Sequence, residues 1–361
     1  MSKYSSIHYQ DYLDLEKILS AQNPRSLEVE GKTAHDEMLF IIIHQVYELW
    51  FKQINHELQD VYHHFQTDDV DEKNINISVH RLDRVIEILK LLIQQVNILE
   101  TMTPLDFLDF RNYLFPASGF QSFQFRQMEV LLGLKQHKRH TAYMQVFNEE
   151  HKSILATLES GKSLLDLVND WLERTPFLNF GEFDFLAQYK LAVEHMLANE
   201  KKAIESTEIL TPQFKEMRLK MLGDTDSYFA VVLDPEHHQK LKDEGKTSLS
   251  YKAMIAALLI NLYRDEPVLH QPFKFLEALT EIDQLITSWR YRHAHMVLRM
   301  LGKKVGTGGS SGHEYLKKTA EKHSIFSDLY NISTLLIPRS ELPDLPESLK
   351  QSLGFHFSTL S

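Results

Sequence analysis

Apolar residues recur every three or four positions along most of this chain, and that spacing is the strongest constraint on its fold. Segments such as VHRLDRVIEILKLLIQQVNIL and YKAMIAALLINLYRDE place their apolar side chains on one face of a helix. Only 13 Gly and 11 Pro interrupt the 361 residues, and no period-two strand or Asn-Gly or Asp-Gly hairpin is evident. The sequence therefore predicts an all-α fold with long helices at about 35–66, 77–100, 148–172, 182–203 and 271–301.

The predicted helices divide the chain into three parts. Residues 1–34 form an N-terminal segment, residues 35–205 and 250–361 form the main helical domain, and residues 206–249 form a small helical insertion. Within the insertion, the stretch 211–248 is more polar and more often interrupted than its surroundings, which favours an excursion from the main bundle over a separate domain. No repeat with a period of 30 to 50 residues is present, which argues against a helical solenoid.

The composition excludes several classes of function. A formal net charge of −11, with Lys and Arg scattered among acids, offers no basic surface to nucleic acid or anionic lipid. The absence of cysteine excludes disulfides, thiolate nucleophiles and iron–sulfur clusters, so any metal must be held by His or carboxylate. Neither a signal-peptide pattern nor an apolar run of roughly 20 residues is present. We therefore expect a cytoplasmic protein that binds neither nucleic acid nor membrane.

A histidine interrupts the apolar run of HDEMLFIIIHQVYELWFKQINHEL, residues 35–58. On a helix, His44 shares a face with Phe40 and Tyr47, where an aliphatic side chain would be less costly to bury. His35 lies nine positions earlier, on the opposite face, so the two histidines are not placed to bind one metal. Two interpretations of His44 stay open here: a core histidine hydrogen-bonded to a neighbour, and a histidine that faces a pocket.

A second histidine interrupts an apolar stripe in ITSWRYRHAHMVLRMLG. Trp289, His293, Val297 and Met300 follow helical spacing, whereas His295 points to nearly the opposite face. An imidazole on an apolar wall, with no cysteine and no second histidine beside it, suits an axial bond to haem iron. Haem requires one protein ligand, while zinc requires three or four. A buried histidine with a backbone partner remains the alternative.

Two further segments have features of a binding site. The loop KKVGTGGSSGHEYL holds four glycines and the hydroxyls of Thr307, Ser310 and Ser311, which favours close backbone approach to a ligand over a plain linker. In PLDFLDFRNYLFPASGF, Phe107 and Arg111 share a helical face, and an arginine beside aromatic rings can hold a carboxylate. A solvated surface arginine is the common alternative for such a position.

Two other metal centres are excluded by motif. A di-iron bundle requires Glu-x-x-His on two helices, and none of the 19 histidines has Glu three positions before it. A zinc peptidase helix requires His-Glu-x-x-His, which is also absent.

Four segments, in this order, closely resemble the tryptophan 2,3-dioxygenase family: HDEMLFIIIHQVYELWFKQINHEL, DFLDFRNYLFPASGFQSFQFR, WRYRHAHMVLRMLGKKVGTGGSSGHEYL and LYNISTLLIPR. The resemblance runs from about Tyr9 to Arg339. It implies an all-α, homotetrameric enzyme with one haem b per subunit. Such an enzyme inserts both atoms of O₂ across the C2–C3 bond of the L-tryptophan indole to give N-formyl-L-kynurenine, the first step of tryptophan degradation by the kynurenine pathway.

The resemblance also implies a role for particular residues. His293 would be the iron ligand, with Trp289 one turn before it and Arg126 a partner for a haem propionate. His44 would face the indole N–H, Arg111 would hold the substrate carboxylate, and Thr307 would hold the amino-acid end. The pocket wall would consist of Phe40, Phe107, Ser118 and Gly119. The N-terminal segment HYQDYL would reach a neighbouring subunit's site through Tyr9, Tyr12 and Leu13.

The chain departs from the family pattern in two places. His313 stands where many members carry Tyr, and the stretch 211–248 matches only loosely. Relatives of this fold also monooxygenate substituted tryptophans. Two hypotheses from other classes are a haem- or indole-binding sensor without turnover and a helical scaffold without a cofactor. The joint presence of His44, Arg111, Thr307 and His293 favours the enzyme.

Overall fold

The computed structural model of the chain describes residues 6–134, 147–302, 304, 316–317, 320–321 and 323–355. Helices make up nearly all of the regular structure in this part of the chain, with one short antiparallel ladder between β1 (Asn179–Phe180) and β2 (Phe183–Asp184). The predicted all-α fold is confirmed, and the ladder is the one element that the helical periodicity did not predict. Thr307 and His313 lie outside the described residues.

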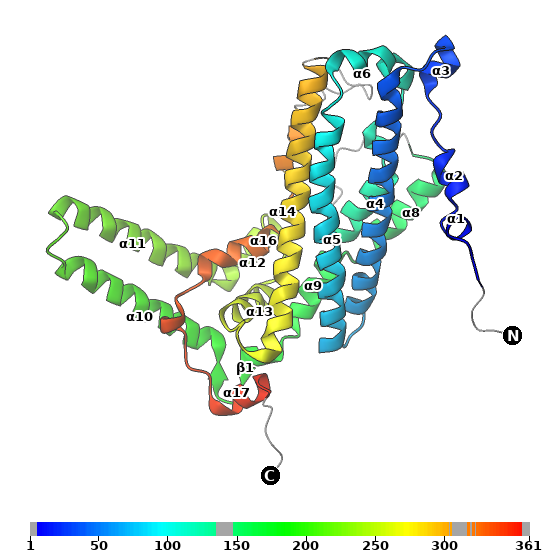
Figure 1. Cartoon of the computed structure of the whole chain (residues 1–361). Coiled ribbons are helices and arrows are strands. Elements are labelled where there is room, and N and C mark those ends of the chain that lie inside the picture. The colour runs from blue at the N-terminus through cyan, green and yellow to red at the C-terminus, as the bar shows by residue number, and fades with distance from the viewer. Residues whose placement is uncertain are drawn as a thin grey trace.

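Three long helices form the centre of the molecule and lie side by side (Figure 1). They are α4 (His35–Phe65), α5 (Glu72–Leu99) and α14 (Pro267–Leu301). Each places an apolar stripe in their common core, where residues such as Ile54, Leu82 and Ile282 have no exposed surface. Two of these helices begin before their predicted starts, α5 at the Asp71 cap and α14 ahead of the internal Pro272.

Shorter elements surround this core. Preceding α4 are α1 (Tyr9–Tyr12), α2 (Leu15–Leu19) and α3 (Arg25–Glu30), and after α5 come α6 (Pro104–Arg111), η1 (Asn112–Leu114), η2 (Gly119–Gln121) and α7 (Phe123–Leu132). Later elements are η5 (Pro176–Leu178), α12 (Pro235–Asp243), α13 (Tyr251–Leu262), α16 (Ser327–Asn331), η6 (Ile332–Leu335), η7 (Arg339–Glu341) and α17 (Glu347–Leu353). Buried Glu37 accepts hydrogen bonds from the backbone N–H groups of Arg25 and Ser26, which attaches the N-terminal segment to α4.

The sequence predicted one continuous helix at 148–172, and this prediction was wrong because the structure has two helices there. α8 (Glu149–Ser160) ends at Gly161, and α9 (Leu164–Glu173) begins after Ser163. Ser163 and Asp166 form a reciprocal capping box, which satisfies backbone N–H groups that an interrupted helix would otherwise expose. This break was visible in the sequence as a glycine followed by Ser-x-x-Asp.

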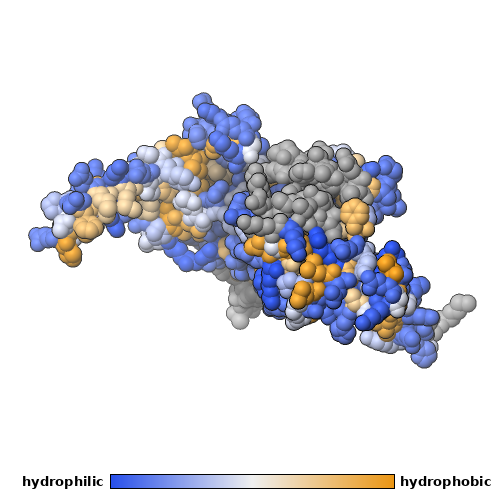
Figure 2. Space-filling view, turned by 90° about the horizontal axis from the view of Figure 1, so that it is seen from above, coloured by the Kyte–Doolittle hydropathy of each residue, from blue (hydrophilic) through white to orange (hydrophobic). Residues whose placement is uncertain are grey.

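Helices α10 (Phe185–Ser206) and α11 (Pro212–Val232) pack against each other as an arm that projects from the core (Figure 1). Figure 2 shows apolar surface along this arm. Its exposed apolar residues on α11 are Phe214, Met217, Met221, Tyr228 and Val231. The expected insertion at 206–249 contains α11 and α12, and its separation from the main domain stays a prediction.

Among the described helices, none combines the length and the hydropathy that crossing a bilayer requires.

Candidate functional site

His44 lies in the first half of α4, and its ring orientation follows from one hydrogen bond. Nδ1 is 2.7 Å from the carbonyl oxygen of Phe40. A carbonyl oxygen only accepts, so Nδ1 donates, and Nε2 of the neutral ring keeps its lone pair. By accessible area His44 counts as exposed, yet burial lowers its pKa, with the Phe40 hydrogen bond opposing that shift. Both observations hold for a ring that lines a hollow inside the protein.

His293, near the end of α14, faces the same hollow. Its side chain is half-buried, and burial lowers its pKa to about 4, with the charge of nearby His44 adding to the shift. The two imidazoles are therefore neighbours, although 249 positions separate them in the sequence. Among the described residues, His293 has no hydrogen-bond partner, so the backbone-bonded alternative raised by its spacing finds no support here.

Aromatic rings of α4 and α7 pack around Trp289, and Trp289 stacks on His293. The indole of Trp289 is nearly parallel to the His293 ring, with centroids 5.3 Å apart and planes 8° apart. Phe125, Phe51 and Tyr47 lie 5.1, 6.0 and 6.1 Å from the Trp289 ring. The Tyr47 hydroxyl donates to the carbonyl of Leu92, and burial raises its pKa to about 12. These rings therefore form a closely packed aromatic wall behind His293.

A second aromatic group joins His44 to α6. Phe40 lies 4.1 Å from the His44 ring, 5.8 Å from Phe107 and 5.5 Å from Phe110, all measured between centroids. α6 begins at Pro104 behind a capping box of Thr103 and Asp106, and half-buried Arg111 is its last residue. The structure thus brings Phe40, Phe107 and His44 together and places Arg111 one turn after Phe107 on the same helix, while their roles in binding a substrate stay predictions.

The other implied pocket residues are placed less directly. Half-buried Ser118 donates its backbone N–H to Gln121 at 3.3 Å, and exposed Gly119 starts η2, where a methyl group in place of its hydrogen would meet no described atom within 4 Å. Tyr9 and Tyr12 are 74% and 72% exposed on α1, which lies apart from α6 in this single chain (Figure 1). Leu13 is half-buried. Their roles in a substrate pocket stay predictions.

A buried ionic network, which the sequence patterns did not indicate apart from Arg126, lies behind the aromatic wall. Glu129 of α7 binds Arg126 at 2.6 Å through one carboxylate oxygen and Arg290 of α14 at 2.6 Å through the other. Arg290 also donates to the carbonyl of His323 at 2.9 Å. Burial by itself would raise the pKa of Glu129, but Arg126, His323 and Arg290 outweigh it and hold that pKa far below its usual range. The propionate role of Arg126 stays a prediction.

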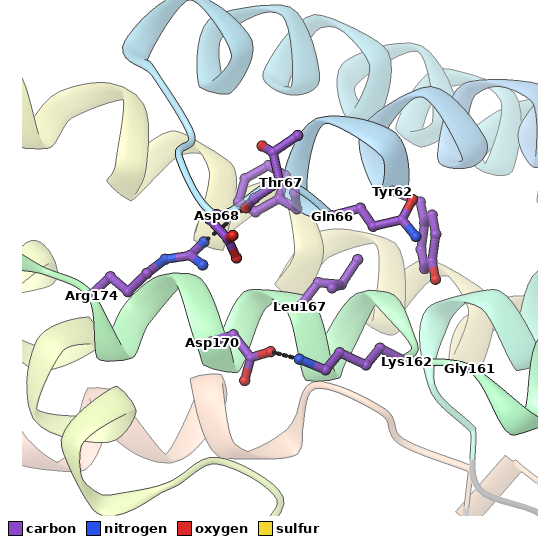
Figure 3. Close-up of a pocket in the computed structure, with 10 residues that line it drawn as sticks. Tyr62, Gln66, Thr67, Asp68, Gly161, Lys162, Leu167, Asp170 and Arg174 are labelled. Carbon is purple, nitrogen blue, oxygen red and sulfur yellow. Dashed lines mark hydrogen bonds and ion pairs between the residues drawn. The ribbon is translucent and has the colours of Figure 1, made fainter.

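A pocket of about 210 Å³ lies elsewhere, near the end of α4 (Figure 3). Three of its four charged residues already interact with protein groups, since Lys162 is paired with Asp170 at 2.6 Å and Arg174 donates to the Thr67 carbonyl at 3.4 Å. Tyr62 of this pocket is 18 residues beyond His44, roughly 27 Å along the helix axis. It is therefore separate from the hollow at His44 and His293.

The donor set at the hollow suits a metal held by one protein ligand. No group of three or more His, Cys, Asp or Glu side chains that could hold a metal ion occurs in the described part of the chain. The His293 imidazole, without a described hydrogen-bond partner and stacked on the Trp289 ring, fits an iron porphyrin, which brings four nitrogen ligands of its own.

Comparisons with known proteins show which family the chain resembles. The family model described as tryptophan 2,3-dioxygenase matches residues 1–336. A tryptophan 2,3-dioxygenase of Bdellovibrio bacteriovorus is 48% identical over 98% of this chain and 100% of its own length. Proteins of the same name from Dictyostelium discoideum and Anopheles gambiae are each 45% identical, over 99% and 96% of this chain and 91% and 89% of their own lengths.

Proposed function

Because the chain belongs to the tryptophan 2,3-dioxygenase family, we propose that it cleaves the C2–C3 bond of the L-tryptophan indole with O₂ to give N-formyl-L-kynurenine. The reaction is the first step of tryptophan degradation through the kynurenine pathway. The observation that carries the proposal is the pairing of His44 and His293 across one aromatic-walled hollow. The two histidines are far apart in the sequence, and the fold brings them together.

Haem b, one per subunit, would be held by His293. The imidazole has no described hydrogen-bond partner, and its low pKa keeps it neutral and available as a ligand near pH 7. Trp289 stacks on it one turn earlier, which restricts the rotation of the ring. When bound, haem supplies the redox chemistry that activates O₂. A scaffold without a cofactor would not benefit from an unbonded histidine in this position, since burying it costs free energy that an aliphatic side chain avoids.

The chain's own residues would bind and orient the substrate. Nε2 of His44 accepts from the indole N–H, because Nδ1 is already committed as a donor to Phe40. Arg111 holds the carboxylate, and Thr307 holds the amino-acid end. Phe40, Phe107, Ser118 and Gly119 form the wall. Anchoring both ends of tryptophan fixes the reacting bond without a conformational search, which is the main contribution that a protein makes to such a reaction.

We propose that His44 orients the indole and does not remove its proton. A neutral imidazole with a free Nε2 is equipped for either role, but addition at C2 of indole proceeds without prior deprotonation. The lowered pKa of His44 also makes it a weaker base than a free histidine. Its contribution is then that of one hydrogen bond, on the order of 0.5–1.5 kcal/mol.

Assembly as a homotetramer completes the proposal. The N-terminal segment exposes an unusual number of apolar side chains, among them Ile7, Tyr9, Tyr12 and Leu19 at 62–74%. Side chains of this kind favour burial against a partner. We propose that Tyr9, Tyr12 and Leu13 contact the substrate in a neighbouring subunit's site, and that the exposed face of α11 also supports assembly.

One assay tests the function. Purified protein reconstituted with haem should show a Soret band, and addition of tryptophan, O₂ and a reductant should produce N-formylkynurenine that carries two ¹⁸O atoms from ¹⁸O₂. A product that keeps the C2–C3 bond and carries a single ¹⁸O atom would indicate a monooxygenase. A Soret band without turnover would indicate a sensor, and no Soret band would leave the cofactor-free scaffold.

A further inference from the structure

We propose that Glu129 is a positioning residue that fixes the turn of α14 carrying His293. This inference rests on the proposed function, since it concerns how the haem ligand is held. Glu129 does not line the hollow; it acts through Arg290, which lies three positions before His293 on the same helical turn. No step of the proposed reaction uses Glu129.

The geometry of Glu129 connects three parts of the chain at one carboxylate. One oxygen binds Arg126 of its own helix, and the other binds Arg290 of α14, each at 2.6 Å. The second oxygen also lies 3.8 Å from Nδ1 of His323, which follows the glycine-rich stretch in the sequence. Glu129 is 1% exposed and its partners Arg126, Arg290 and His323 are 8%, 5% and 4% exposed, so water does not compete for these contacts.

Two residues on one face of α14, Asp283 and Arg290, form hydrogen bonds to residues 323–326. Arg290 donates to the His323 carbonyl at 2.9 Å. Asp283, seven residues earlier and therefore on the same helix face, accepts from Ser324 Oγ at 2.6 Å and from the N–H groups of Ile325 and Phe326 at 3.0 and 3.2 Å. α14 is thus held against α7 by Glu129 and against residues 323–326 by Asp283 and Arg290.

Arg290 also contacts the aromatic wall, which gives a second connection to the helical turn of α14 that carries His293. The Arg290 guanidinium lies 5.9 Å from the centre of the Phe125 ring, and Phe125 packs at 5.1 Å against Trp289, which stacks on His293. Movement of Arg290 would therefore be transmitted through Phe125 and Trp289 as well as through the helix backbone. Both routes end at the imidazole that would bind iron.

The ionic character of this network argues for a positioning role. Buried ion pairs lose much of their attraction to desolvation, and apolar residues of similar volume often stabilise a core as well or better. A carboxylate between two guanidinium groups does, however, hold each partner in one direction, because the arginine fork is planar. The network therefore restricts the rotation and height of the His293 turn in a way that an apolar contact does not.

Glu129→Gln tests the inference, because it keeps the volume and removes the charge. Mutation of a residue that orients a metal ligand through a hydrogen bond typically lowers metal affinity about 10- to 100-fold. We expect faster haem transfer from the variant to apomyoglobin, by roughly tenfold or more, and a shifted Soret band of the ferrous protein. The kcat should fall while the KM for tryptophan changes little, because Arg111 and His44 are untouched.

Two variants keep the test decisive. Arg290→Lys keeps the positive charge but loses the fork that contacts Glu129 and the His323 carbonyl together, and it should show the same spectral shift even if Glu129→Gln folds poorly. Glu129→Asp, which keeps the charge on a shorter side chain, should recover part of the wild-type haem retention. Failure of both Gln and Lys variants to change haem retention and the Soret band would overturn the inference.

Asp328→Asn is the matched control. Asp328 is also a buried acid, and it accepts from Thr247 Oγ and from the N–H groups of Ser248 and Leu249, between the start of α16 and the segment before α13. It should lower the melting temperature without changing the Soret band or the rate of haem loss. If Asp328→Asn and Glu129→Gln change haem loss and the Soret band equally, Glu129 contributes to the stability of the fold and does not position His293. Wild-type protein without a Soret band would overturn the haem proposal itself, and with it this inference.

Discussion

The indole of Trp289 and the imidazole of His293 stack nearly parallel, 5.3 Å apart between centroids and 8° apart in plane. The two residues are four positions apart on α14, so the helix itself brings one ring above the other. Phe51, Phe125 and Tyr47 enclose the indole from α4 and α7. A ring held in this way loses rotational freedom before any ligand arrives, which favours a fixed direction for a bond to iron.

Replacing His293 should abolish stable haem binding. In His293→Ala, the Soret band of the reconstituted protein should be lost or readily removed by apomyoglobin, because the variant lacks the one imidazole that we propose as the protein ligand of the iron. His295→Ala is the matched control, since His295 is exposed two positions later on nearly the opposite helix face. Absorbance titration with hemin measures both. Tight hemin binding by His293→Ala would assign the ligand elsewhere.

The size of the loss in kcat/KM for His44→Ala distinguishes an orienting histidine from a general base. Loss of one neutral hydrogen bond of about 0.5–1.5 kcal/mol lowers kcat/KM for tryptophan by roughly 2- to 12-fold. Loss of a general base lowers it by roughly 10²- to 10⁴-fold. We expect the smaller effect, with continued turnover of 1-methyltryptophan, which has no N–H to remove. Steady-state kinetics checks this, and a variant that binds haem and tryptophan but turns over neither substrate would contradict the orienting role.

Arg111→Ala should raise the KM for tryptophan. A charged hydrogen bond to a carboxylate contributes about 1.5–3 kcal/mol, which corresponds to roughly a 12- to 150-fold change in kcat/KM. Tryptamine lacks the carboxylate, so wild type and variant should use it with similar, low efficiency. The measurement is the ratio of kcat/KM for tryptophan to kcat/KM for tryptamine in the wild type and in the variant. An equal loss with tryptophan and tryptamine would mean that Arg111 supports the fold of α6 and does not contact the carboxylate.

Glu129 should make the protein sensitive to acid. Its pKa in the folded protein lies well below the ordinary value of 4.5, so its stabilising contribution is fully present above pH 4.5 and is lost as the pH falls towards the folded value. At pH 7, Glu129→Gln should lower the free energy of unfolding by about 3–5 kcal/mol, because two buried arginines lose their counter-ion.

Urea unfolding at pH 7, 5, 4 and 3 measures the acid effect. The difference in stability between wild type and Glu129→Gln should shrink below pH 4.5, because Glu129 takes up a proton in the unfolded chain while it stays ionised in the folded protein. Exposed Glu208→Gln serves as the control and should change stability by less than about 0.5 kcal/mol. A difference that stays constant from pH 7 to pH 3 would contradict the lowered pKa.

The N-terminal segment should act on a neighbouring site. A chain that lacks residues 1–19 but keeps its own hollow should be inactive alone, and so should a full-length chain with His293→Ala. Co-expression of the two should restore activity, because the N-terminal segment of the second chain can reach the haem site of the first. Size-exclusion chromatography with light scattering reports the mixed assembly. The absence of any restored activity in a mixed tetramer would place Tyr9 and Tyr12 outside the site.

Local chemistry in the sequence determined the all-α fold and the identity of the two unusual histidines. Helical periodicity acts over a few residues, and an imidazole within an apolar stripe is visible at the same range, as at His44 and His293. Turn chemistry is also local, and at Gly161 the Ser-x-x-Asp cap that follows outweighs the apolar pattern that predicted one continuous helix.

The pairing of those histidines, and the network behind them, depended on tertiary structure. Glu129 and Arg290 are 161 positions apart, and no spacing rule relates a residue of α7 to one of α14. Their contact follows from how α4, α5, α7 and α14 pack, which depends on the shapes of many side chains at once. The sequence alone determines which residues are costly to bury. Only the packed helices decide which of them meet, because side-chain contact across a core depends on three-dimensional packing and not on separation along the chain.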